Sequence, residues 1–152
     1  MARNRSQPDE SRVITRPGIK MSLLATSDDT DGAWSLIENE ANPGQGPAPH
    51  WHKEMIEGFY ILEGKVDFEI DDEDRRAGPD EFVLVPPRRV HTFTVVSDEP
   101  ARYLILVSPG GLEEYFKEIQ ELRAGVDEWP PSDMAPVIEV MERYDTYLPP
   151  VE

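Results

Sequence analysis

Prolines and glycines divide this chain into short segments, and that division restricts its fold more than any other feature. The 152 residues include 15 prolines and 10 glycines. Proline breaks a helix interior and removes a hydrogen bond from a sheet, so it is tolerated mainly between elements. The segments between these breaks have strand length, and Val66–Ile70 alternates apolar and acidic residues as a strand with one buried face does. The pattern therefore predicts a mainly all-β domain.

The apolar segments recur at even spacing, which is typical of a β-sandwich or barrel. We predict strands at residues 12–15, 19–25, 33–38, 59–62, 66–70, 82–85, 92–96 and 103–107, with turns or loops at 28–32, 42–49 and 71–80. An apolar stripe with helical spacing predicts a helix at 112–122, and a second short helix is expected at about 136–143. The predicted organisation is a disordered N-terminal tail at 1–10, a β-barrel at 11–108 and a helical extension at 109–152 that packs on the barrel.

The charge and the missing cysteines exclude several classes of function. The chain carries 31 acidic against 15 basic residues, a formal net charge of -16. Binding to phosphate backbones requires a basic surface, so we exclude nucleic acid as a partner. The absence of cysteine excludes disulfides, thiolate zinc sites and cysteine nucleophiles. The sequence also has no apolar stretch of the length that a signal peptide or a membrane span requires, so we expect a cytoplasmic protein with no membrane contact.

The chain has three histidines, and their spacing suits a metal site. His50 and His52 are two residues apart, so on an extended segment both rings point to the same face. Glu57 follows at an odd offset, which requires a turn at 53–55 before its carboxylate can join them, and His91 comes from a later strand. Imidazoles and a carboxylate suit a divalent transition metal, and an octahedral ion would keep two positions for water, substrate or dioxygen. We predict that His50, His52, Glu57 and His91 bind such an ion, with Glu57 also the candidate catalytic base.

Further side chains are candidates for a substrate pocket beside this site. Four apolar side chains are candidates for its wall, with core filling as the alternative role: Phe59, Ile61, Phe68 and Phe93. Arg88 is a candidate clamp for an anionic substrate, although paired arginines on an acidic protein commonly serve as surface charge. Trp51 lies between two inward histidines, so we expect it to point outward and to act in packing or in a dimer contact.

Residues 44–64 resemble the first cupin motif, G-x5-H-x-H-x4-E-x6-G, at every defined position. The second cupin motif, G-x5-P-x-G-x2-H-x3-N, is met only in part. Its proline and histidine correspond to Pro86 and His91, whereas its two glycines and its asparagine are replaced by Asp80, Arg88 and Val95. We expect the Gly78-Pro79 pair, directly before Asp80, to supply the first turn instead.

The resemblance implies a small single-domain cupin, similar to those labelled quercetin-dioxygenase-like. Such a protein is a double-stranded β-helix, or jelly-roll barrel, with one or two C-terminal helices, usually a homodimer, and with one divalent metal ion per chain. Fe, Mn or Ni is the expected ion, with Zn or Cu as alternatives. Three functions stay open: a metal-dependent dioxygenase acting on a small aromatic or enol-like substrate, a non-oxidative isomerase or decarboxylase, and a non-catalytic binding or sensor module.

Overall fold

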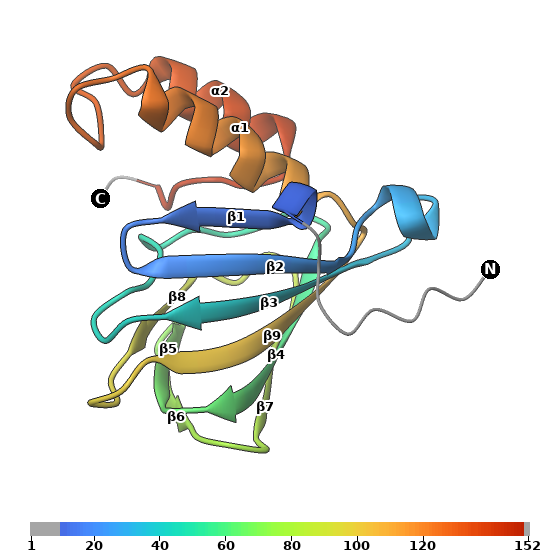
Figure 1. Cartoon of the computed structure of the whole chain (residues 1–152), viewed down its shortest axis with the longest axis vertical. Helices are drawn as coiled ribbons and strands as arrows, with labels where there is room; N and C mark the ends of the chain where they lie inside the picture. Colours follow the sequence, from blue (N-terminus) through green and yellow to red (C-terminus); the bar gives the residue numbers. More distant parts are fainter. Residues whose placement is uncertain (1–9, 151–152) are drawn as a thin grey trace.

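The computed structural model describes residues 10–150, and its strands form two antiparallel sheets that face each other (Figure 1). The larger sheet has the strand order β1-β2-β3-β9-β4-β7 and the smaller one the order β6-β5-β8. The strands are β1 (Val13–Arg16), β2 (Ile19–Ala25), β3 (Ser35–Ala41), β4 (Ile56–Glu63), β5 (Val66–Ile70), β6 (Glu73–Ala77), β7 (Phe82–Val85), β8 (His91–Val95) and β9 (Ala101–Ser108). The helical elements are the 3-10 turns η1 (Glu10–Arg12) and η2 (Asp28–Thr30) and the helices α1 (Leu112–Ala124) and α2 (Ala135–Arg143).

Aromatic rings from both sheets meet in the barrel interior. Phe59 comes from β4 of the larger sheet, whereas Phe68 and Phe93 come from β5 and β8 of the smaller one. Their ring centroids lie 5.0 to 5.5 Å apart, in the tilted and edge-on arrangements that aromatic pairs favour. All three rings are buried, so their contact joins the two sheets through one apolar core. The result is the mainly β jelly roll that the sequence predicts.

Most predicted strands are confirmed, with ends that shift by a few residues. The strand predicted at 82–85 matches β7 at both ends, whereas the strand predicted at 33–38 lies at Ser35–Ala41. The predicted loop at 42–49 contains no strand. Of the predicted N-terminal tail, residues 1–9 lie outside the described residues, while Glu10 begins η1.

The prediction of a turn over all of residues 71–80 was wrong, because Glu73–Ala77 forms strand β6 and pairs with β5. This strand lies at the edge of the smaller sheet, and Ala77 is its one buried residue. Arg76 in β6 forms an ion pair of 2.7 Å with Asp67 opposite it in β5. Because an exposed edge strand needs no apolar alternation, hydrophobic periodicity gives no sign of it.

The two predicted helices are confirmed, and they lie together over β1 (Figure 1). Their contact surface forms a small apolar cluster of its own, built around Ile119, Val137, Val140 and Met141. After α2 the chain runs back beneath the helices, where Tyr147 pairs with Trp51 in an isolated antiparallel bridge. Within residues 10–150, no helix combines the length and the apolar character that crossing a membrane requires.

Candidate metal centre

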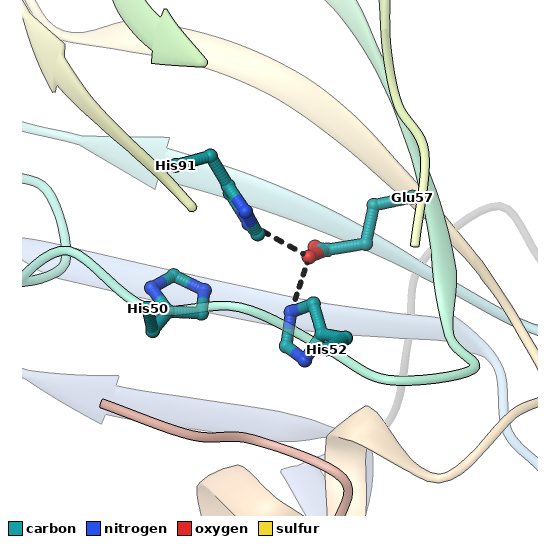
Figure 2. A group of neighbouring side chains, drawn as sticks. All are labelled: His50, His52, Glu57 and His91. Carbon is teal, nitrogen blue, oxygen red and sulfur yellow. Dashed lines mark hydrogen bonds and ion pairs between the residues drawn. The ribbon is translucent and has the colours of Figure 1, made fainter. Parts of the chain in front are cut away.

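The backbone brings the four predicted ligand side chains to one end of the barrel (Figure 2). His50 pairs with His91 through reciprocal hydrogen bonds, of 3.1 Å from the His50 amide and 2.8 Å from the His91 amide. Glu57 is the second residue of β4, where it lies between Val107 of β9 and Val85 of β7 and points inward. One ligand atom from each of His50, His52, Glu57 and His91 lies within 4.8 Å of the others. The structure therefore brings together the four side chains that the sequence singles out.

Each imidazole is oriented by a hydrogen bond from its Nδ1 atom to a backbone carbonyl. The acceptors are Ala48 for His50 (2.8 Å), Asp145 for His52 (2.9 Å) and Arg89 for His91 (2.9 Å). A carbonyl oxygen can only accept, so in all three rings Nδ1 must carry a proton. In the neutral rings the Nε2 lone pair is therefore free to bind a metal ion, which is the arrangement that protein metal sites use to fix a histidine ligand.

Two of the three Nε2 atoms contact the carboxylate of Glu57. His52 Nε2 lies 2.6 Å from Glu57 Oε1, and His91 Nε2 lies 3.1 Å from the same oxygen. The buried His52 Nε2 has no aligned hydrogen bond, although it is in contact with that oxygen. Electron-pair donors that face one another at such distances repel unless a cation lies between them. A divalent ion fits this requirement, and in its absence a proton on His52 serves the same purpose.

The ionisation of these groups follows from burial and from their mutual contacts. Burial, with a further effect of the neighbouring His91, lowers the pKa of His50 to about 4. Burial alone would lower the pKa of His52 too, but the contact with Glu57 outweighs it and raises that pKa. Burial would raise the pKa of Glu57, but its close contacts with His52 and His91 hold it below its usual range. The site therefore presents an ionised carboxylate and a neutral His50 at neutral pH.

The four side chains are not equally accessible. His52, Glu57 and His91 are almost fully buried, with exposed fractions of 3%, 4% and 1%. His50 is half-buried. A metal ion or a small molecule would therefore reach the ligand atoms from the His50 side.

The candidate pocket residues occupy two different environments. Phe59, Ile61, Phe68 and Phe93 are buried within the main core, where the three rings pack on one another. Their role in lining a pocket stays a prediction beside this core-filling role. Arg88 is exposed, and its amide donates a hydrogen bond of 2.6 Å to the His52 carbonyl. Its role as an anion clamp likewise stays a prediction.

The packing role predicted for Trp51 is confirmed. Its ring stacks on Tyr147 with centroids 4.6 Å apart, and its indole N–H donates to the Leu148 carbonyl at 3.2 Å. Sequence reasoning missed the residues that precede Tyr147, namely Asp145 and Thr146, which contact His52 directly. No spacing rule links them to a histidine 93 residues earlier, so the sequence offers no signal that would have found them.

Four backbone positions in the two motifs take the left-handed conformation that glycine favours. Gly44 and Gly64, the first and last residues of the first motif, have φ angles of 86° and 85°. Asp80 and Arg88, which stand where the second motif has glycines, have φ angles of 68° and 69°. The expectation that Gly78-Pro79 supplies the first of these turns is confirmed, because the Gly78 carbonyl accepts a hydrogen bond of 3.1 Å from the Glu81 amide and so closes a turn over Pro79 and Asp80. Asp80 takes the left-handed position of this turn, which aspartate tolerates better than most residues. The backbone at Asp80 and Arg88 thus has the conformation that the two glycines of the second motif favour, although neither residue is a glycine.

Comparisons with known proteins agree with this fold. A family model described as "Cupin domain" matches residues 39–107. Over 97 residues the chain is 29% identical to the quercetin 2,3-dioxygenase of Bacillus subtilis (strain 168), a match that covers 64% of this chain and 28% of that protein. The chain thus spans less than a third of the length of this relative.

Two solved structures share the fold. "The structure of KdgF from Halomonas sp." superposes with a TM-score of 0.60 at 18% identity, covering 73% of this chain and 99% of that one. A predicted oxalate decarboxylase from Thermotoga maritima superposes with a TM-score of 0.56 at 17% identity, covering 60% and 80%. At these identities the likeness concerns the fold alone.

Proposed function

This chain is a small cupin protein, and from that premise we propose that it binds one divalent transition metal ion and uses it as a dioxygenase on a small organic substrate. The observation that carries the proposal is the cluster of three Nδ1-protonated imidazoles and one buried, ionised carboxylate, whose ligand atoms lie within 4.8 Å of one another. The ligands are His50, His52, Glu57 and His91. Their three nitrogens and one oxygen donor suit Fe, Mn or Ni, with Zn or Cu as alternatives.

The charge and the openness of the site suit catalysis. Three neutral imidazoles and one carboxylate would leave a divalent ion with a net positive charge, and the partial exposure of His50 leaves one side of the site approachable. When bound, the ion would supply Lewis-acid and redox chemistry to a substrate or dioxygen at its open positions. Of the four ligands, the Glu57 carboxylate is the best candidate to accept a substrate proton. In each histidine, Nδ1 already carries a proton that it donates to a backbone carbonyl, and Nε2 would be bound to the metal ion.

We propose an aromatic or enol-like compound as the substrate. The support is the quercetin dioxygenase relative together with the aromatic side chains beneath the site. A non-oxidative reaction, an isomerisation or a decarboxylation, is the second candidate, because a solved structure of the same fold is described as a predicted oxalate decarboxylase. A module that binds without turnover is the third.

One experiment separates these functions. The metal content of protein purified without a histidine tag is measured first, and dioxygen uptake is then followed with a panel of flavonols, catechols and small enols. We expect about one metal ion per chain and dioxygen consumption in step with product formation. Product without dioxygen consumption would replace the dioxygenase by the non-oxidative enzyme. Saturable binding of a compound without any product would favour the binding module.

The metal ligands are tested in the same preparation. A His52→Ala variant should lose most of its metal, because the remaining ligands cannot hold a divalent ion in the same geometry. Full metal occupancy in that variant would contradict the proposed site.

We also propose that two copies of the chain associate, as the resemblance implies. Large apolar side chains are exposed on the outer face of the larger sheet, among them Phe82 and Leu84 of β7 and Leu106 of β9. Leu84 and Leu106 lie on either side of Gly58 in the sheet register. Analytical ultracentrifugation of the wild type and of a Leu84→Lys variant tests this, since the variant should shift towards the monomer if this face is the contact.

A further inference from the structure

The turn between two of the candidate ligands is held by a side chain from the opposite end of the sequence. His52 and Glu57 flank this turn, and the amides of Lys53, Glu54 and Met55 donate hydrogen bonds of 2.9 Å each to the carboxylate of Asp145. Oδ1 accepts the first of them and Oδ2 accepts the other two. An ionised acceptor makes stronger hydrogen bonds with amides than a neutral one, so this carboxylate fixes three consecutive peptide units.

The backbone of the same residue holds the His52 ring. The Asp145 carbonyl accepts the Nδ1 proton of His52 at 2.9 Å, and the hydroxyl of the buried Thr146 lies 3.3 Å from that nitrogen. His50 and His91, by contrast, donate to carbonyls only two residues before them. The orientation of His52 alone therefore depends on a distant segment of the chain.

The segment at residues 144–148 is anchored independently of the histidine. Trp51 and Tyr147 exchange two backbone hydrogen bonds of 2.9 Å, and their rings stack. The Thr146 amide donates to the carbonyl of Met141 in the last turn of α2 at 2.9 Å. Asp145 has a φ angle of 56°, a left-handed conformation that aspartate tolerates. The segment is thus a fixed support rather than a loop that follows His52.

We propose that Asp145 is a positioning residue of the metal centre. Its carboxylate sets the spacing between His52 and Glu57, and its carbonyl sets the tautomer and the angle of the His52 ring. It touches neither metal nor substrate. This inference rests on the metal-binding part of the proposed function.

The test compares three variants by two measurements. Asp145→Gly removes the carboxylate and keeps a residue suited to a positive φ angle, whereas Asp145→Asn keeps that conformation and one acceptor oxygen. Asp31→Gly is the matched control, because Asp31 also has a left-handed backbone (φ 52°) and its carboxylate makes no hydrogen bond with the described residues. The first measurement is a Co²⁺ titration followed by visible absorption, which gives both the dissociation constant and the spectrum of the bound cobalt. The second is the Nδ1–H resonance of His52 in the metal-free protein by ¹⁵N NMR.

We expect Asp145→Gly to weaken Co²⁺ binding by about tenfold to a hundredfold, the range typical of losing a group that orients a metal ligand. Its cobalt spectrum should change, and its His52 Nδ1–H should exchange faster with solvent. Asp145→Asn should lie between this variant and the wild type, and Asp31→Gly should match the wild type. If Asp145→Gly does not fold, the proposal is tested with Asp145→Asn. An affinity of Asp145→Asn for Co²⁺ equal to that of the wild type would overturn the proposal.

The two measurements separate failure of this inference from failure of the proposed function. Wild-type protein that binds no Co²⁺ would refute the metal site, and the His52 resonance would still report on Asp145. An Asp145→Gly variant whose Co²⁺ affinity and His52 exchange both equal those of Asp31→Gly would refute the positioning role.

Discussion

Two buried glutamates lie in different regions of this molecule, and their surroundings differ in kind. Glu113, at the start of α1, accepts a hydrogen bond of 2.6 Å from the Ser27 amide and another of 2.6 Å from the Ser35 hydroxyl. Glu57, inside the barrel, contacts imidazole nitrogens instead. In both places burial would raise the pKa of the carboxyl and its contacts lower it.

The difference lies in what the partners can release. An amide and a hydroxyl keep their protons near neutral pH, and the positive end of the α1 dipole adds a fixed attraction for the Glu113 carboxylate. An imidazole can give up its Nε2 proton, so a metal ion can replace that proton beside Glu57. The Glu113 region therefore stabilises the fold, whereas the Glu57 region is prepared to bind a cation. Substitutions at the two glutamates should separate these roles.

The largest expected effect is on metal binding. Glu57→Gln should weaken the affinity for Co²⁺ by about a hundredfold or more, because a neutral amide replaces the one anionic ligand. The metal-free variant should unfold with a free energy within about 1 kcal/mol of the wild type, since His52 can lose its proton once the carboxylate is gone. Cobalt titration and urea unfolding measure the two quantities. A variant that kept full affinity would make Glu57 a second structural carboxylate.

At Glu113, in the first turn of α1, we expect the opposite: a loss of stability without a loss of metal affinity. Glu113→Gln should reduce the free energy of unfolding by about 2 kcal/mol, because its amide NH₂ would face the Ser27 amide or the Ser35 hydroxyl and leave one of these donors without an acceptor. Its affinity for Co²⁺ should remain unchanged. Urea unfolding of the metal-free protein gives the first value. Loss of cobalt affinity without loss of stability would erase the contrast between the two regions.

A smaller change sharpens the assignment of the Glu113 partners. Ser35→Ala removes one donor to Glu113 and the acceptor of the Gly111 amide at the start of α1. We expect a loss of about 1 kcal/mol in the free energy of unfolding, since the Ser27 amide still satisfies the other carboxylate oxygen. The double variant with Glu113→Gln should lose less than the sum of the two single losses. Additive losses would mean that Ser35 acts independently of Glu113.

The smallest effect is the pH dependence of stability. Because the pKa of Glu113 is lowered in the folded state, its contribution is complete above the ordinary glutamate pKa of about 4.3 and disappears as the pH falls through the lower folded value. The difference in unfolding free energy between the wild type and Glu113→Gln should therefore shrink as the pH falls below about 4. Urea unfolding at a series of acidic pH values tests this. A difference that stayed constant would show that the ionisation of Glu113 does not contribute.

Features that depend on neighbours in sequence were predictable from the sequence. The two-residue spacing of His50 and His52 and the turn before Glu57 follow from strand geometry, and the apolar alternation of β5 shows which face is buried. Features that depend on distant contacts were not. Strand β6 is charged and almost entirely exposed, so its sequence shows no apolar alternation. Asp145 contacts His52 from 93 residues further along the chain. Glu113 reads as an ordinary acidic residue in the first turn of a helix, because its burial depends on loop residues far away in sequence.

The site itself can be tested by anomalous diffraction at the cobalt edge from crystals of the cobalt-loaded protein. Our account predicts one strong peak per chain, within bonding distance of the Nε2 atoms of His50, His52 and His91 and of the Glu57 carboxylate. A strong peak held by other residues, or no peak inside the barrel at saturating cobalt, would contradict it.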